Sequence, residues 1–144
     1  MTHGIDTDFL VAAEITDHPF HLQADALLWR LMDDGHDFAL APQTLAEFIH
    51  VVTDSRRMPR PLTTPDAIGR AEHWWQSSEV LHVFPDGQSL NAFFGWLRRH
   101  QLGRKRLLDT LFAATLRNAG IRRIISNNTR DFEVLGCFEV IEFK

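Results

Sequence analysis

Short apolar segments that alternate with amphipathic stretches are the feature that most constrains the fold of this chain. Residues 3–6, 37–41, 80–84, 121–126 and 137–143 have the pattern of strands. Helical spacing of apolar residues separates the first four of these segments. Strands that are separated by helices pair in parallel through crossover connections. We therefore expect an α/β fold, a three-layer α/β/α sandwich around a mostly parallel sheet.

Six segments have the apolar spacing or end signals of helices. Gly35 and Gly120 are expected to end the helices that precede them, because glycine readily adopts the left-handed conformation found there. Thr64 is expected to cap another helix, with Pro65 as its first residue. No helix is expected between the last two strands. The expected helices cover residues 9–15, 20–34, 42–52, 65–78, 89–100 and 106–118.

The length of the chain predicts a single domain. Its 144 residues fall within the usual size of one domain, so we expect one unit over residues 1–144. The only cysteine, Cys137, has no partner for an internal disulfide, which favours a reducing compartment. No apolar run is long enough to span a membrane, and the first residues do not resemble a secretory signal. We expect a cytoplasmic protein that does not contact membranes.

Charge is distributed unevenly along the chain. The net charge is −4, but residues 98–130 contain nine basic residues and one acidic residue, for a net charge of +8. A local basic region can bind phosphates even in an acidic protein. Ordinary solvated helix and loop surfaces would give the same pattern. The candidate substrate-binding residues are Arg104, Lys105, Arg106 and Arg130.

Polar residues follow three of the expected strands, where ligands bind in folds of this class. Asp6 closes the first strand, Glu47 lies in the helix after the second, and Asn128 and Asp131 follow the fourth. The carboxyl ends of parallel strands share one edge of the sheet. Each residue also has a simple structural interpretation, as a helix cap, a first-turn acid or a turn residue.

Asp109 is the least ordinary of these acids. Its neighbours at i+3, i+4 and i+7 are Phe112, Ala113 and Leu116, so it lies on an otherwise apolar helical face. A buried carboxylate needs a cation, a donor or a metal. Several acids that converge on one edge would repel each other, and a divalent ion resolves the repulsion. Oxygen ligands favour Mg²⁺, or Mn²⁺ in its place, and such a site can activate water against a phosphodiester.

Four segments resemble, in order and spacing, the acidic motifs of the PIN domain, and most of all the VapC-type toxins of bacterial type II toxin–antitoxin pairs. The segments are GIDTDFLV, LAEFIHVVT, LLDTLFAATLRNAG and ISNNTRDFEVLG. The resemblance covers essentially the whole chain. It implies a PIN-like sandwich and a Mg²⁺- or Mn²⁺-dependent endoribonuclease that cuts tRNA or ribosomal RNA. It also implies a homodimer and a cognate antitoxin that inserts a peptide near the site.

The resemblance assigns roles to the candidate residues. Asp6, Glu47 and Asp109 match the three metal-binding acids, which together with Asp131 and Asn128 form the expected catalytic set. The expected mechanism is attack of a metal-activated water on phosphorus. Two positions depart from the pattern. Asp8 stands where the family often has Asn or Ser, and Asn128 stands where it often has an acid, so Asp131 is the candidate for the missing charge.

Three other functions are compatible with parts of the pattern. A catalytically inactive PIN-like module that binds RNA or a protein partner is the main alternative, because Asn128 replaces an acid. A receiver-like phosphoacceptor domain would need a lysine at a strand end, and the only lysines are Lys105 and the terminal Lys144. A DNA nuclease of related fold would need more chain for duplex-binding elements.

Overall fold

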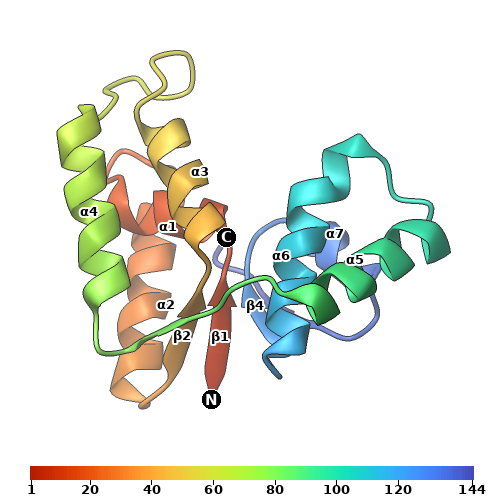
Figure 1. Ribbon diagram of the computed structural model, residues 1–144. Coiled ribbons are helices and arrows are strands. Elements are labelled where there is room, and N and C mark those ends of the chain that lie inside the picture. Colours follow the sequence, from red (N-terminus) through yellow and green to blue (C-terminus); the bar gives the residue numbers. More distant parts are fainter.

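Five strands form one sheet in the order β3-β2-β1-β4-β5, and all four neighbouring pairs are parallel. The computed structural model describes residues 1–144 (Figure 1). The sheet confirms the expected α/β class. The first strand has the predicted length but begins one residue earlier, and the other four strands are shorter than the apolar segments that predicted them. The strands are β1 (Thr2–Ile5), β2 (Asp37–Leu40), β3 (Val80–His82), β4 (Arg123–Ile125) and β5 (Glu139–Ile141).

All six expected helices are present. The helix over residues 42–52 has the predicted bounds, and each of the others has at least one end shifted by one or two residues. Thr63, one residue before the expected cap, accepts a hydrogen bond from the Asp66 amide. Asp86 and Ser89 form a reciprocal capping box, which begins the fifth helix two residues early. The helices are α1 (Thr7–Glu14), α2 (His21–Asp33), α3 (Pro42–Val52), α4 (Thr64–Gln76), α5 (Gly87–Arg99) and α6 (Leu107–Asn118).

The prediction of no helix between the last two strands is wrong. A short helix, α7 (Thr129–Glu133), follows β4, and a single 3-10 turn, η1 (Arg104–Arg106), precedes α6. Five residues are too few to show helical periodicity in a sequence. The helix is held by one fully buried side chain, Phe132, which packs edge-on against Phe112 of α6.

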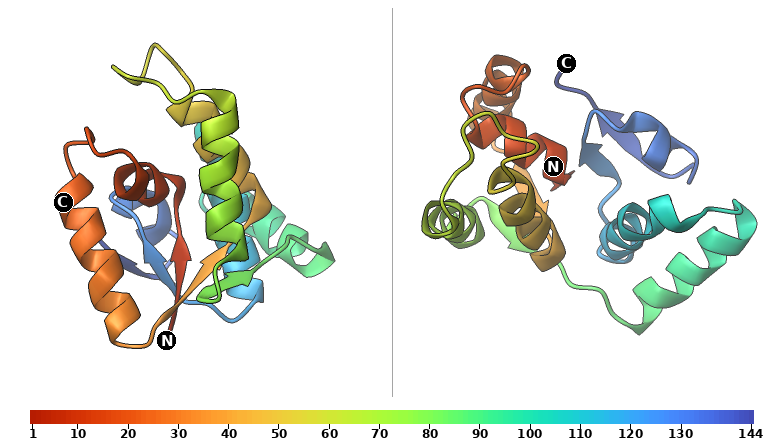
Figure 2. Two further views of the ribbon diagram at one scale, coloured as in Figure 1. Left: turned by 90° about the vertical axis from the view of Figure 1, so that its left-hand side faces the viewer. Right: turned by 90° about the horizontal axis from the view of Figure 1, so that it is seen from above.

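Helices cover both faces of the sheet and give three layers (Figure 1, Figure 2). One apolar core joins the sheet to α1–α4, and a second core joins it to α5, α6 and α7. Parallel strands covered on both faces carry continuous apolar runs, as in β4, where Ile124 and Ile125 are fully buried on opposite cores. No helix is long and apolar enough to cross a membrane.

The strand order reverses between β1 and β4. From β1 the chain proceeds outward through β2 and β3, and it then returns to place β4 on the other side of β1. The connections after β1 and β4 therefore diverge toward opposite faces, with α1 and α2 on one side and α7 on the other. Ligands bind at this kind of switch point, beyond the carboxyl ends of the strands.

Gly4 permits the close approach of α6 to the sheet. A Cβ atom at this position would overlap Cδ1 of Leu116 and would press against its Cδ2 and Cγ at 3.0 and 3.2 Å, and the Leu116 side chain is fully buried. We predict that Gly4→Val lowers the free energy of unfolding by about 1–3 kcal/mol, the usual effect of overpacking. Denaturant unfolding tests this. Gly69→Ala on α4, where a Cβ meets nothing, should leave stability unchanged or raise it by up to about 1 kcal/mol; similar losses in both variants would contradict the account.

Candidate active site

Asp6 lies at the switch point, and its side chain is held by the first amide of α1 and by a hydroxyl that follows β4. It directly follows β1, and its amide donates to the Ile125 carbonyl of β4. The carboxylate is buried. One oxygen accepts a hydrogen bond from the Thr7 amide at 2.8 Å, and the other accepts one from the Ser126 hydroxyl at 2.7 Å. The neighbouring loops therefore fix the orientation of this acid.

Asp8 is the second acid of the same edge. Its Oδ2 accepts from the Asn127 amide at 2.8 Å and from the Ser126 hydroxyl at 3.3 Å, so Ser126 links the two acids. Its Oδ1 is buried and has no hydrogen-bond partner. A buried carboxylate oxygen without a donor is costly. The hydrogen-bonding capacity of this oxygen is therefore unsatisfied within the protein.

Asp109 and Glu47 approach the same place from two other helices. Asp109 lies in the first turn of α6, half-buried, and Glu47 lies exposed on α3. Together with Asp6 and Asp8 they line one pocket of about 320 Å³. The remaining lining residues are Thr7, Val11, His18, Val51, Arg57, Met58 and Asn128. We call this the acidic pocket.

The acidic pocket resists the accumulation of negative charge. Burial, and after it the charge of neighbouring carboxylates, raises the pKa of Asp109 to about 7. Burial also raises the pKa of Asp6 and of Asp8 above the ordinary range, and the charge of Asp6 adds to the effect on Asp8. No carboxylate of the pocket forms an ion pair within the protein, since all seven ion pairs involve other acids. The pocket therefore favours a cation.

The other two candidates of the catalytic set occupy different positions. Asn128 lines the acidic pocket and lies beside Asp6, where it favours the charged form of that acid. Asp131 does not line the pocket. It lies in α7 next to Asp109, and its carboxylate forms an ion pair with the Arg106 Nε at 3.1 Å. The charge of Asp131 is thus already compensated.

None of the four predicted substrate-binding residues lines the acidic pocket. Arg104, Lys105 and Arg106 form the turn before α6, and Arg130 is exposed on α7. The cationic residue that lines the acidic pocket is Arg57, with His18 nearby. Neither residue is among the predicted site residues, because each lies in a loop without periodicity and reaches the pocket through tertiary structure.

The donor set of the pocket fits a hard cation that keeps bound water. No three Asp, Glu, His or Cys side chains lie close enough together to hold an ion on their own. Mg²⁺ takes one or two protein carboxylates and retains several waters, whereas a structural zinc site is closed by four protein ligands. The unpartnered Oδ1 of Asp8 and the half-buried carboxylate of Asp109 match the first requirement.

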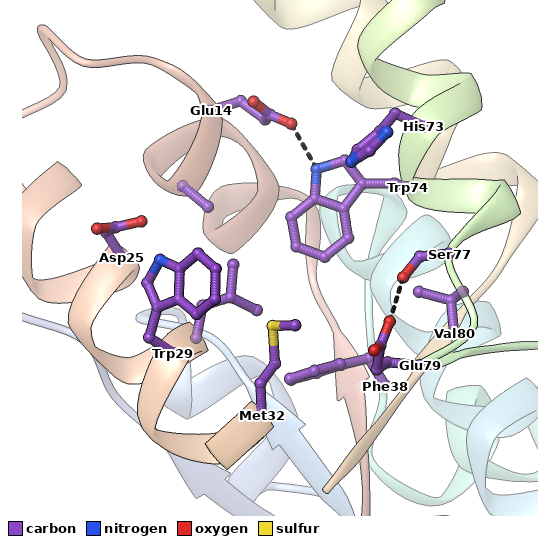
Figure 3. A pocket seen from close by; sticks show the side chains of 12 residues that line it. Glu14, Asp25, Trp29, Met32, Phe38, His73, Trp74, Ser77, Glu79 and Val80 are labelled. Atoms are coloured by element: carbon purple, nitrogen blue, oxygen red, sulfur yellow. Dashed lines mark hydrogen bonds between the residues drawn. The ribbon is translucent and has the colours of Figure 1, made fainter. Parts of the chain in front are cut away.

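A second pocket lies on the face covered by α1–α4 and has a different character. It has a volume of about 270 Å³ between α2 and α4. Figure 3 shows Trp29, Met32 and Trp74 around it, with the Trp74 indole N–H donating to a Glu14 carboxylate oxygen at 2.6 Å. None of the acids of the acidic pocket lines it. Its apolar walls and acidic rim suit a side chain rather than a metal ion.

Comparison with known proteins identifies the class of fold. No family model matches the sequence, and no curated protein matches it significantly. Among solved structures, the chain has the fold of VapC toxins, which confirms the PIN-like sandwich that the resemblance implied. The similarity extends over essentially the whole chain.

Three solved structures illustrate the match. VapC20 of Mycobacterium tuberculosis, described as a sarcin–ricin loop cleaving toxin, aligns with a TM-score of 0.72 and 20% identity, covering 97% of this chain and 98% of that one. VapBC2 of Rickettsia felis, bound to a promoter DNA fragment, gives 0.71 and 17%, covering both chains completely. VapBC-1 of nontypeable Haemophilus influenzae gives 0.66 and 15%, covering 99% and 98%.

Proposed function

We propose that this chain is a metal-dependent endoribonuclease and the toxin of a toxin–antitoxin pair. The observation that carries the proposal is the acidic pocket, where four carboxylates gather at the switch point of the sheet without a cationic side chain paired to any of them. Three of them have raised pKa values. The shared fold with VapC20 supports RNA as the substrate class.

The residues of the pocket would have different roles in hydrolysis. Asp8 and Asp109 would hold the ion, with Asp6 behind them. Bound Mg²⁺ would supply a Lewis acid and a more acidic water. Ser126 and the Asn127 amide orient Asp8, and Ser126 also orients Asp6, as the outer partners of metal ligands usually do. Glu47, which is exposed and lines the pocket, would accept a proton from the attacking water.

An antitoxin is the partner that the structural neighbours support. Several of them are toxin–antitoxin complexes. The pocket of Figure 3 is our candidate binding site for an apolar side chain of that partner, because Trp29 and Trp74 line it. Its acidic rim of Glu14, Asp25 and Glu79 would favour flanking basic residues. We also retain the expectation of a homodimer.

Cleavage of RNA by the purified protein, free of antitoxin, tests the proposed function. We expect discrete cuts in total RNA with Mg²⁺ or Mn²⁺, and loss of all cuts when a chelator is added. Transfer RNA and ribosomal RNA should be tested as separate substrates. Intact RNA under every metal condition, with no Mn²⁺ binding, would instead favour a PIN-like module that binds RNA or protein without cutting.

A further inference from the structure

Two loops that are distant in sequence form one wall of the acidic pocket. The first connects α1 to α2, and the second connects α3 to α4. Arg60 of the second loop makes a two-pronged ion pair with Asp17 of the first, at 2.9 and 2.6 Å. Arg70 of α4 also donates to the Glu14 carbonyl at the end of α1. The first contact joins the two loops at the surface, and the second joins the helices from which they extend.

The first loop presents His18 with a defined tautomer. The Phe20 amide donates a hydrogen bond to His18 Nδ1 at 3.0 Å. Nδ1 is therefore an acceptor, and the neutral ring carries its proton on Nε2. Burial lowers the pKa of His18, which keeps the ring neutral near pH 7. His18 therefore offers one uncharged N–H donor at the acidic pocket.

The second loop presents Arg57 in a fixed turn. The amides of Arg57 and Met58 both donate to the Asp54 carbonyl, at 3.1 and 2.9 Å. The Arg57 side chain lies 3.7 Å from the Asp54 carboxylate, and it remains 57% exposed. Its neighbour Arg56 is 90% exposed and does not line the pocket. No carboxylate of the pocket is paired with Arg57.

We infer that His18 and Arg57 form the phosphate-binding side of the acidic pocket and hold a backbone phosphate of the RNA across from the carboxylates. The inference deepens the proposed function and rests on it. A phosphodiester would be repelled by carboxylates alone, and it needs donors on its other side. A guanidinium binds two phosphate oxygens at once, and a neutral imidazole N–H adds a third hydrogen bond without attracting the acids.

RNA binding without cleavage tests the inference. The probe is a fluorescently labelled RNA hairpin, and anisotropy is measured in chelator with Asp109→Asn as the non-cleaving background. We expect Arg57→Gln to raise Kd by about 5- to 10-fold and to reduce the salt slope by about one phosphate contact. Arg57→Lys should recover part of the affinity. The matched control, Arg56→Gln, should change Kd by less than about twofold.

His18 has its own pair of variants. His18→Leu removes the Nε2 donor and should raise Kd several-fold. In His18→Gln the amide nitrogen takes the approximate place of Nε2, so binding should be largely retained. Thermal unfolding of each variant checks that the fold is intact. Equal losses in the Leu and Gln variants, with normal unfolding, would overturn the role of His18.

The outcomes separate this inference from the nuclease proposal. If the wild-type protein cuts RNA, but Arg57→Gln binds the hairpin as tightly as Arg56→Gln, the inference is wrong and the nuclease stands. If the protein never cuts, but binding depends on His18 and Arg57, the nuclease proposal fails and the phosphate-binding side stands. Absence of hairpin binding in all proteins also overturns the inference.

Discussion

Asp109→Asn is expected to reduce metal-dependent RNA cleavage by about 100- to 1000-fold while the protein remains folded. The substitution keeps the size of the side chain and removes one of the two carboxylates that we assign to the ion. Loss of a metal-supported step corresponds to several kcal/mol of transition-state stabilisation. Single-turnover kinetics measure the loss of cleavage, and Mn²⁺ titration of the same preparations measures the loss of metal binding.

Asp66→Asn is the matched control for this substitution. Asp66 lies in the first turn of α4, as Asp109 lies in the first turn of α6, but it is exposed and outside the acidic pocket. The Asp66→Asn protein should cut RNA at the wild-type rate. A fully active Asp109→Asn protein would contradict the assignment of Asp109, and equal loss in both variants would indicate a general effect on the helices.

Asp109→Asn is also expected to stabilise the metal-free protein at alkaline pH. The raised pKa of Asp109 means that the folded state binds more protons than the unfolded state between about pH 4 and 7. Stability therefore falls as pH rises through that window, and the ionised acid destabilises the fold above it. In chelator at pH 8, the free energy of unfolding of Asp109→Asn should exceed that of the wild type by about 1–2 kcal/mol after allowance for the partial exposure of Asp109. This corresponds to roughly 5 °C in Tm.

Two comparisons isolate this effect. At pH 5 the carboxyl of Asp109 is protonated in the fold but is already mostly ionised in the unfolded chain, so the difference between the two proteins should fall to less than about half of its value at pH 8. The comparison also cancels the contributions of His3 and His18, whose lowered pKa values reduce stability as pH falls. Mg²⁺ at pH 8 should raise the Tm of the wild type more than that of the variant. A difference independent of pH and metal would contradict the account.

The layout of the fold could be predicted because it depends on local signals. Buried parallel strands are short apolar runs, and the helices between them carry periodic apolar stripes. The order of the elements along the chain and the parallel pairing of the strands follow from these patterns. The ends of elements are less predictable. Asp86 and Ser89 cap α5 through a reciprocal contact that a prediction based on apolar spacing overlooks. Helix α7 depends on Phe132 entering a core assembled from other elements.

Some residues of the candidate site could also be predicted from local signals, and others could not. The acids Asp6, Glu47 and Asp109 could be named because strand ends and an apolar helical face give them unusual surroundings, and the structure brings all three to one pocket. The importance of Asp8 could not be derived, because its contact with Asn127 spans 119 positions of sequence. Arg57 lies in a loop between α3 and α4 without helical or strand periodicity, so its place in the pocket follows only from tertiary structure.

The most direct test of the account is the location of Mn²⁺ in a crystal of the protein grown at about pH 8, read from its anomalous scattering. A carboxylate site of this kind binds Mn²⁺ in place of Mg²⁺. We predict one strong peak in the acidic pocket within coordination distance of Asp8 Oδ1 and of the Asp109 carboxylate, and no peak there in Asp109→Asn. An empty pocket at saturating Mn²⁺, or a peak elsewhere on the protein, would contradict the assignment of this pocket as a metal-dependent nuclease site.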